Sequence, residues 1–291
     1  MGEHAAIAAL TANLKAVGDD CAVLPNPGSD YDLVLTSDPL IENVHFTAEA
    51  TPEQIGRKAI CRVLSDFAAM GAEPQYLLIN VVAPPEQDFQ TLEKIYAEFS
   101  PSNSLGTGTL MEKFGIEIVG GDLAQGPVLE LHVFGVGRVP KGTARLRSGA
   151  KPGDLIYVTG PLGGAQQSGR QFTFEPRIEW GRALRESGIV TSMMDISDGL
   201  ATDLRHILKA SSVGAEIDGS LIPCNGTLEQ ALTDGEDFEL LFTAPPSANF
   251  QTLLPRDAQN FSCIGTVTGH PEELLLDGAP IPGKAFEHFK N

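Results

Sequence analysis

The order of apolar and polar residues changes between helix-like and strand-like patterns several times along this chain. The clearest helical segment covers residues 51–72, which read TPEQIGRKAICRVLSDFAAMGA. Thr51 can cap this segment, Pro52 suits the first turn of a helix, and Gly71 suits the C-terminal end. We therefore predict one long helix over 51–72.

Several shorter segments in the first half carry strand or helix patterns. Residues 128–139 alternate apolar residues with other residues, which is the period-two pattern of a sheet with two unlike faces. Further strands are predicted over 32–38, 74–84 and 115–122, and further helices over 3–15 and 88–99. The Ser-, Gly- and Pro-rich stretch 100–110 is not predicted to be a helix.

The second half mixes strands and helices in the same way. We predict a strand and a Gly-rich loop over 155–165, a helix over 177–188, and strands within 235–246 and 261–269. Residues 191–218 are predicted to form a strand, an acidic loop and a helix that ends near Gly214. The turn-rich stretch RSGAKPGD marks a boundary near 140–150. The fold class expected is therefore α/β (α+β), with subdomains over 1–145 and 146–291.

Composition narrows the classes of protein that fit. The 291 residues carry a formal net charge of −18, which argues against nonspecific binding to nucleic acid or to anionic membranes. The four cysteines are far apart and form no CxxC pair, so neither a zinc site nor a redox motif is indicated. No basic and apolar leader opens the chain, and no apolar run has transmembrane length. A cytoplasmic, reduced enzyme is the default expectation.

Aspartates recur at the edges of the apolar segments. Six of them have this setting, namely Asp20, Asp38, Asp66, Asp122, Asp195 and Asp198. One such aspartate alone would be read as a turn or a helix cap. Their recurrence favours another role, because unpaired carboxylates are costly to bury and the nearby basic residues are too few to pair all six. Magnesium, which prefers oxygen ligands and bridges carboxylates to phosphates, would relieve their repulsion.

Common nucleotide and metal motifs are missing from the sequence. Residues 195–206 fail as a calcium loop because Gly199 comes one place early and His206 stands where glutamate is required. The Gly-rich loop after residue 158 has no GK[ST], and no GxGxxG or HExxH is present. Scattered carboxylates suit phosphoryl transfer instead, because metals neutralise the phosphates and little covalent chemistry falls to the protein.

The motifs together resemble one family, the bacterial thiamine-monophosphate kinases. They occur in the family's order as GDDCAVL, TSDPLIENVHF, GRKAICRVLSDFAAMGAEP, IVGGDLAQGP, LRSGAKPGDLIYVTGPLG, MDISDGLATDLRHI and GEDFELLFT. The resemblance runs from about residue 18 to the C-terminus. SDFAAMGA and DISDGL are shared with the wider superfamily, which includes aminoimidazole ribonucleotide synthetase, selenophosphate synthetase and HypE-like maturation proteins.

The resemblance implies an activity and a set of site residues. It implies direct transfer of the γ-phosphoryl group of ATP to thiamine monophosphate, with no general base assigned. It implies that several Mg2+ ions would be held by Asp20, Thr36, Ser37, Asp38, Asp66, Asp122, Asp195 and Asp198. ATP would contact Gly121, Asp122, Arg147 and Ser197, and the thiamine substrate would contact His45, Glu236 and Phe286. It also implies a homodimer whose N-terminal sheets pair into a barrel.

Other interpretations of these residues stay open at this stage. Arg147 can simply pair with a surface carboxylate, His45 can be a satisfied, partly buried histidine, and Glu236 with Asp237 can be a solvated turn. The rival functions are another ATP-dependent enzyme of the superfamily, such as a synthetase-like ligase or a HypE-like protein, and a non-catalytic cation- or nucleotide-binding protein. Turnover of thiamine monophosphate separates them.

Overall fold

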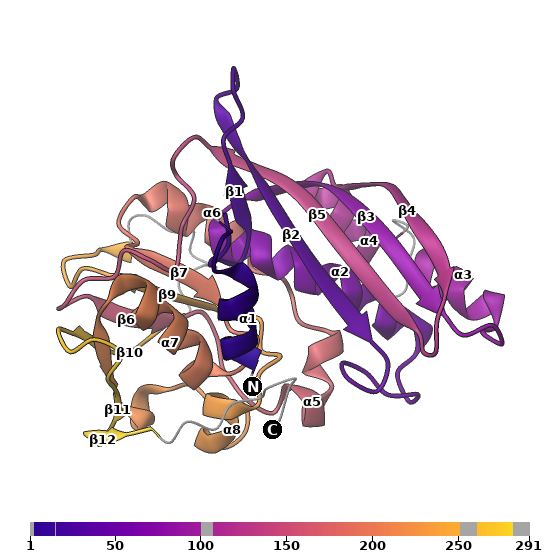
Figure 1. The fold of residues 1–291 in the computed structure, drawn as a ribbon. Helices are drawn as coiled ribbons and strands as arrows, with labels where there is room; N and C mark the ends of the chain where they lie inside the picture. Colours follow the sequence, from indigo (N-terminus) through magenta and orange to yellow (C-terminus); the bar gives the residue numbers. More distant parts are fainter. Residues whose placement is uncertain (1–2, 15, 100–106, 251–260, 282–291) are drawn as a thin grey trace.

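The computed structural model describes residues 3–14, 16–99, 107–250 and 261–281. In this part of the chain the strands form two sheets (Figure 1). The first sheet has the strand order β1-β2-β5-β3-β4, and its strands are β1 Ala22–Leu24, β2 Tyr31–Ile41, β3 Glu73–Ala83, β4 Glu117–Gln125 and β5 Glu130–Pro140. The pair β3–β4 is parallel and the other pairs are antiparallel.

The second sheet has the strand order β12-β11-β8-β10-β6-β9-β7. Its strands are β6 Leu155–Val158, β7 Ser192–Asp195, β8 Gly214–Ile217, β9 Leu240–Ala244, β10 Ser262–Thr268, β11 Leu274–Leu276 and β12 Ala279–Pro280. The chain passes from the first sheet to the second between Pro140 and Leu155, which is where the expected division at 145/146 falls.

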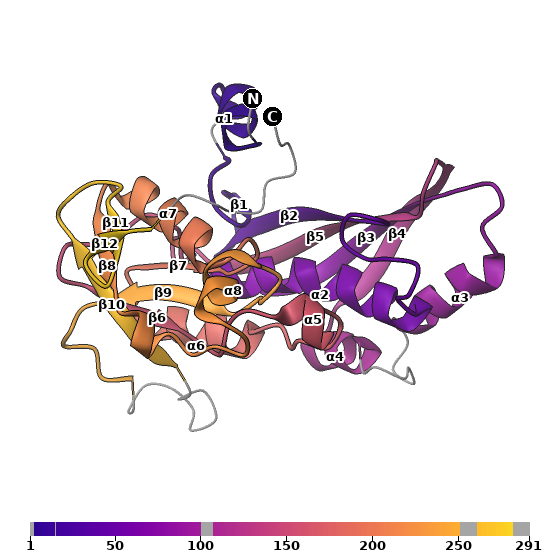
Figure 2. The ribbon, with the colours of Figure 1, turned by 90° about the horizontal axis from the view of Figure 1, so that it is seen from below.

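The helices lie between and around the two sheets. They are α1 Glu3–Thr11, α2 Pro52–Met70, α3 Phe89–Ala97, α4 Thr107–Phe114, α5 Ala165–Ser168, α6 Ile178–Ser187, α7 Leu200–Ser211 and α8 Leu228–Thr233, with short 3-10 turns η1 Arg170–Phe172 and η2 Gly219–Leu221. Figure 2 shows α2 running along one face of the first sheet. The same helix contacts β7 and α6 of the second half, so it lies at the centre of the molecule.

Local signals explain why α2 begins and ends where it does. Thr51 accepts a hydrogen bond from Gln54 N–H, and the Gln54 side chain bonds back to Thr51, which makes a capping box. Gly71 ends the helix in the left-handed conformation with φ +63°. The predicted helix over 51–72 is therefore confirmed, including its cap and its stop.

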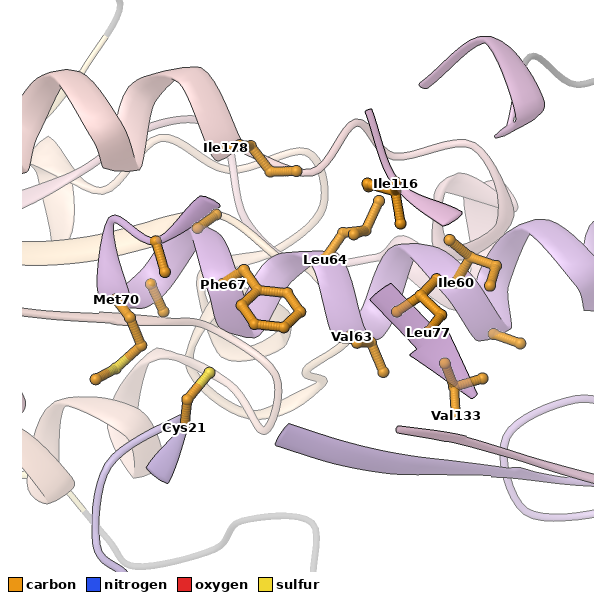
Figure 3. Packing of buried hydrophobic residues seen from close by; sticks show 14 of the residues in the cluster. Cys21, Ile60, Val63, Leu64, Phe67, Met70, Leu77, Ile116, Val133 and Ile178 are labelled. Carbon is orange, nitrogen blue, oxygen red and sulfur yellow. The ribbon is translucent and has the colours of Figure 1, made fainter. Parts of the chain in front are cut away.

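The main hydrophobic core surrounds α2. Ile60, Val63, Leu64, Phe67 and Met70 point from this helix into a cluster that also contains residues of both sheets (Figure 3). Two glycines of β5 allow the Phe67 ring to lie close to the strand. A Cβ on Gly135 would stand 2.6 Å from Phe67 Cε2, and one on Gly137 would stand 2.7 Å from Phe67 Cε1. A second core lies around α7 and contains Leu204, Ile207 and Met194. The first of these two cores contains residues of both sheets, so the two halves share it.

Most predicted elements are present, and several bounds differ. The helix predicted over 3–15 ends at Thr11, and the strand predicted within 155–165 ends at Val158. The helix predicted to end near Gly214 stops at Ser211, because Ser212 takes a left-handed cap and Gly214 begins β8. Thr107 to Leu110, within the stretch not predicted to be helical, form the first turn of α4, and residues 100–106 lie outside the described part.

The pleat of the first sheet separates two sets of side chains. On β2, Asp32, Val34, Thr36, Asp38 and Leu40 alternate with residues that face away from α2. Ser37 belongs to the other set and stands in one cross-strand row with Phe134 and Leu78. This outer face of the sheet bears large apolar side chains, since Tyr76, Leu78 and Phe134 are 43%, 38% and 39% exposed.

Candidate active site

One helix, α2, presents a charged stripe to the region where the two halves meet. Lys58, Arg62 and Asp66 are spaced by four residues, so they lie on one side of the helix. All three are largely buried, with side-chain exposures of 0% for Lys58 and 12% for Arg62. A buried charge requires partners, so the neighbours of this stripe define the site.

Four of the six predicted carboxylates gather in one place, three of them beside Asp66. Burial, followed by the charges of its neighbours, holds the pKa of Asp66 well above its usual range. The neighbouring carboxylates that act in this way are Asp38, Asp195 and Asp20. Burial first, and then the charge of Asp20, raises the pKa of Asp195 to about 7. These four residues, which we call the carboxylate cluster, come from the β1 approach, β2, α2 and β7.

Each member of the cluster has a hydrogen-bond or ion-pair partner within the protein. Arg62 binds Asp38 with two nitrogens, at 3.1 Å and 3.3 Å. Arg147 Nη2 lies 2.7 Å from Asp20 Oδ1, and because the Asp20 side chain is only 2% exposed, this partner is not the surface carboxylate considered as an alternative for Arg147. Thr36 donates its hydroxyl to Asp66. Asp195 accepts a hydrogen bond from Ser65 Oγ at 2.5 Å.

The acidic loop after β7 contributes Ser197 and Asp198. Their backbone N–H groups both donate to Asp203 Oδ2 at 3.0 Å, so this side chain from the first turn of α7 fixes the loop. Burial, followed by Asp198 and Asp195, holds the pKa of Asp203 well above its usual range. Gly199 opens the helix at φ +101°, and a Cβ there would stand 2.8 Å from Leu232 O, so glycine is required.

A cleft of about 210 Å³ adjoins the carboxylate cluster. It is lined by Asp38, Val44, His45, Arg62, Gln166, Ser197, Asp198, Asp234, Glu236 and Phe238. The predicted substrate residues His45 and Glu236 thus share one cavity with the predicted metal ligands Asp38 and Asp198. His45 Nδ1 accepts a hydrogen bond from Ile41 N–H at 3.0 Å, which fixes its ring.

The GED segment, residues 235–237, is a buried and anchored loop. Glu236 lies at φ +60° and Phe238 at φ +52°, conformations that are costly for residues other than glycine. Glu236 N–H donates to Ser197 O at 2.8 Å, so the segment runs beside the acidic loop. The Glu236 carboxylate pairs with Lys58 at 2.6 Å and with Arg62 at 3.4 Å. The alternative of a solvated turn is therefore wrong.

A buried network of ion pairs contacts this loop through Asp237. Glu239 is fully buried and accepts hydrogen bonds from Arg177 at 2.8 Å and 2.7 Å and from Thr159 at 2.7 Å. Arg170 pairs with Glu239 and also donates to the Asp237 carbonyl at 2.8 Å. Both carboxylate oxygens of Asp237 lie 2.9 Å from Gly163 N–H. These bonds hold the strained loop in place.

Some predicted site residues lie apart from the cluster. Ser37 points to the outer face of the sheet, opposite to Thr36 and Asp38. Gly121 and Asp122 lie on the edge strand β4, and the register aligns Asp122 with Pro39 on β2 through three strand spacings. At about 4.8 Å per spacing, Asp122 lies about 14 Å from Pro39, the residue that follows Asp38 on β2. Phe286 lies outside the described residues.

The cluster suits a divalent cation by its chemistry. Asp20 Oδ2 is buried with no hydrogen-bond partner, and Asp66 is crowded by three other carboxylates. In the described ranges, however, no set of three His, Cys, Asp or Glu side chains is already arranged to hold an ion. Arg147 binds only Oδ1 of Asp20, which leaves Oδ2 for a cation, whereas Arg62 binds both carboxylate oxygens of Asp38 and competes there with a metal ion.

Four residues that matter here were not predicted as site residues: Lys58, Arg62, Asp203 and Glu239. The four-residue spacing of Lys58, Arg62 and Asp66 was a usable signal for the first two, because it places their charges on the same helix side as a predicted ligand. The roles of Asp203 and Glu239 depend on contacts with segments distant in the chain, which spacing does not reveal.

Comparison with known proteins shows the family of this chain. Residues 18–139 match the model of the AIR synthase related protein, N-terminal domain, and residues 151–276 match that of the AIR synthase related protein, C-terminal domain. The thiamine-monophosphate kinase of Escherichia coli strain K12 is 36% identical, with 94% of this chain and 91% of the relative covered. This chain belongs to the thiamine-monophosphate kinase family. The kinase of Methanospirillum hungatei JF-1 is 34% identical over 93% of this chain and 92% of the relative.

Solved structures of the family have the same fold. The structure of AaThiL complexed with AMPPCP and TMP superposes with a TM-score of 0.85 at 28% identity, covering 99% of this chain and 97% of that one. The hydrogenase maturation protein HypE in complex with ATP has a TM-score of 0.68 at 19% identity, covering 95% of this chain and 88% of that one, and shares the fold.

No helix within the described ranges of this family member is both long and apolar enough to cross a membrane.

Proposed function

We propose that this member of the family transfers the γ-phosphoryl group of ATP to thiamine monophosphate, giving thiamine diphosphate and ADP. The observation that carries the proposal is the carboxylate cluster beside the cleft that contains His45 and Glu236. A phosphate acceptor and ATP are both polyanions, so their repulsion must be screened before they approach each other. Acidic side chains recruit the cations that do this.

The residues present would hold Mg2+ at Asp20, Asp38, Asp66 and Asp195, with Thr36 and Asp198 at the edge of the set. Bound Mg2+ would neutralise phosphate charge as it does in other phosphoryl transfers. Arg62 and Arg147 keep Asp38 and Asp20 neutralised in the metal-free protein. When these carboxylates take another partner, the guanidinium groups become available to phosphate oxygens, which they bind with a fork geometry.

The thiamine end of the substrate is proposed to lie against His45 and Glu236, with Phe286 as a third contact. The Glu236 carboxylate can accept a hydrogen bond from the substrate or face its positive ring. No general base is assigned, because the phosphate oxygen of the acceptor is already ionised near neutral pH. Ser197 is proposed to contact ATP, since it lines the same cleft as Asp198.

The decisive experiment is a steady-state assay with ATP, Mg2+ and thiamine monophosphate. Formation of thiamine diphosphate and ADP in equal amounts, lost on addition of EDTA, is the expected result. Absence of thiamine diphosphate under saturating substrates would exclude this activity and leave a different reaction of the superfamily.

We also propose a homodimer built on the outer face of the first sheet. The support is the exposed apolar row of Tyr76, Leu78 and Phe134 on adjacent strands, since exposed apolar patches of this kind mark interaction surfaces. Phe134→Glu should convert the dimer to a monomer in analytical ultracentrifugation. A wild-type protein that sediments as a monomer at high concentration would refute the dimer.

Gly121 and Asp122 are proposed to act on ATP across this interface, because one chain leaves them at the far edge of its sheet. Mixing Asp66→Asn with Asp122→Asn tests this. If Asp122 serves the partner's site, heterodimers contain one intact site and the mixture recovers about a quarter of wild-type activity, as a two-fold symmetric interface requires. If both residues serve the same chain's site, the mixture stays inactive.

A cytoplasmic location is proposed on separate grounds. All four cysteines, Cys21, Cys61, Cys224 and Cys263, are free thiols, which agrees with a reducing compartment.

A further inference from the structure

Lys58 is a fully buried lysine whose ammonium group is held by three oxygens. Nζ lies 2.6 Å from the His45 carbonyl, 2.5 Å from Gln171 Oε1 and 2.6 Å from Glu236 Oε2. It also lies 5.3 Å from the centroid of the Phe172 ring. Two of its N–H groups donate hydrogen bonds to the His45 carbonyl and to Gln171, and the contact with Glu236 Oε2 is an ion pair. Lysine is almost never fully buried without such pairing.

The partners of Lys58 come from segments far apart in the chain. His45 follows β2, Gln171 belongs to η1, and Glu236 precedes β9. His45 and Glu236 both line the cleft, whereas Lys58 does not. One buried ammonium group therefore ties together the backbone of one cleft residue and the side chain of another.

The second cation near Glu236 does not duplicate this contact. Arg62 Nη1 is 3.4 Å from Glu236 Oε1, and its remaining nitrogens bind Asp38. Lys58 is nearer to the Glu236 carboxylate and also reaches His45, which no Arg62 contact described above does. Glu236 holds a left-handed backbone conformation at φ +60°, so it depends on outside contacts to stay in place.

We propose that Lys58 is a positioning residue that fixes His45 and Glu236 relative to each other and so sets affinity for the thiamine end of the substrate. This inference rests on the proposed function, which assigns that end of the substrate to these two residues. Lys58 acts through them and does not touch the substrate. Its loss leaves the Glu236 carboxylate without its nearest cation and releases the His45 carbonyl.

The test compares Lys58→Met with a matched control, Arg57→Met. Arg57 is the preceding residue on α2, is also buried, and donates to Phe174 O at 2.6 Å, but its described contacts do not reach His45 or Glu236. Lys58→Met should raise KM for thiamine monophosphate about 10- to 100-fold, the range for loss of a hydrogen bond to a charged group. KM for ATP should change by less than about three-fold, and Arg57→Met should change neither KM, although both variants are expected to lose stability.

Two further variants separate positioning from mere stability. Lys58→Gln keeps an N–H donor in the same space and should recover part of the affinity, and it replaces the methionine variant if that one fails to fold. Combining a Lys58 variant with Glu236→Gln should raise KM by less than the product of the two separate effects, because residues that share a contact are not additive. Fully additive effects, or a KM for thiamine monophosphate equal to that of Arg57→Met, would overturn the inference.

A structural measurement keeps this inference distinct from the proposed function. If the wild-type protein does not phosphorylate thiamine monophosphate, the proposed function fails on that result alone. A crystal structure of the Lys58 variant then tests the positioning claim by itself. Displacement of the Glu236 side chain and of the 42–46 segment is expected, and an unchanged arrangement of both refutes the claim.

Discussion

The carboxylate cluster predicts an unusual stability effect for Asp195→Asn in the metal-free protein. Burial, then the charge of Asp20, raises the Asp195 pKa from 3.8 to about 7. An increase of about three units corresponds to about 4 kcal/mol of unfolding free energy lost when the group ionises. Asparagine removes this charge and keeps a side-chain oxygen that can accept the hydrogen bond from Ser65 Oγ. In the wild-type protein this bond to Asp195 is 2.5 Å long.

The sign follows from the protons bound in each state. Below the unfolded pKa of 3.8 the carboxyl is protonated whether the chain is folded or not, and the folded protein keeps this proton up to about pH 7. The folded state therefore binds more protons within this window, so the free energy of unfolding falls as the pH rises through it. Above the folded pKa the contribution is fully lost, and the asparagine variant does not suffer this loss.

Urea unfolding in EDTA at about pH 4 and about pH 8, followed by circular dichroism, measures the effect. We expect Asp195→Asn to match wild type at the lower pH and to exceed it by up to about 4 kcal/mol at the higher pH. Asp154→Asn is the control, because Asp154 is also buried but bonds Thr191 outside the cluster, and it should gain nothing. A variant no more stable than wild type at about pH 8 would show that the cluster carries no such repulsion.

Three further substitutions test the site and its support. Asp66→Asn should abolish Mg2+-dependent turnover and weaken Mg2+ binding in calorimetry while circular dichroism stays native; wild-type turnover at limiting Mg2+ would contradict a ligand role. Gly181→Ala should destabilise the α2–α6 contact by about 1–3 kcal/mol in urea, because its Cβ would stand 1.9 Å from Ala68 O, and an unchanged midpoint would mean that the helices separate freely. Glu239→Gln should cost about 3–5 kcal/mol, seen as a lower Tm, because it leaves the Arg177 pair broken in a buried site; no loss would show that the network is dispensable.

Local sequence rules predicted most of the helices and strands of this fold. The cap at Thr51 and the stop at Gly71 lie within a few residues of the atoms they satisfy, so the bounds of α2 could be predicted without knowing the rest of the chain. Errors fell where tertiary contacts decide the end of an element. The helix before Gly214 ends early because Gly214 belongs to β8. Glycine is required at this position of the strand, since an added Cβ would stand 2.1 Å from His270 O.

The candidate site could be predicted only in part. The recurrence of aspartates beside apolar segments indicated that Asp20, Asp38, Asp66 and Asp195 lie close together. The physical reason is that an unpaired carboxylate is costly to bury, so several in such a setting indicate a shared site. The pattern could not indicate that Ser37 faces away. A side chain's face depends on the pleat and on which side of the sheet α2 covers.

The sequence by itself determined the elements, the two-part organisation and the acidic chemistry of this protein, because caps, periodicity and charge act over short distances. Only the tertiary structure decided which of these acids meet, that Lys58 joins His45 to Glu236, and that Glu239 supports a strained loop. These outcomes depend on how α2 packs between two sheets, which brings together atoms separated by more than a hundred residues along the chain.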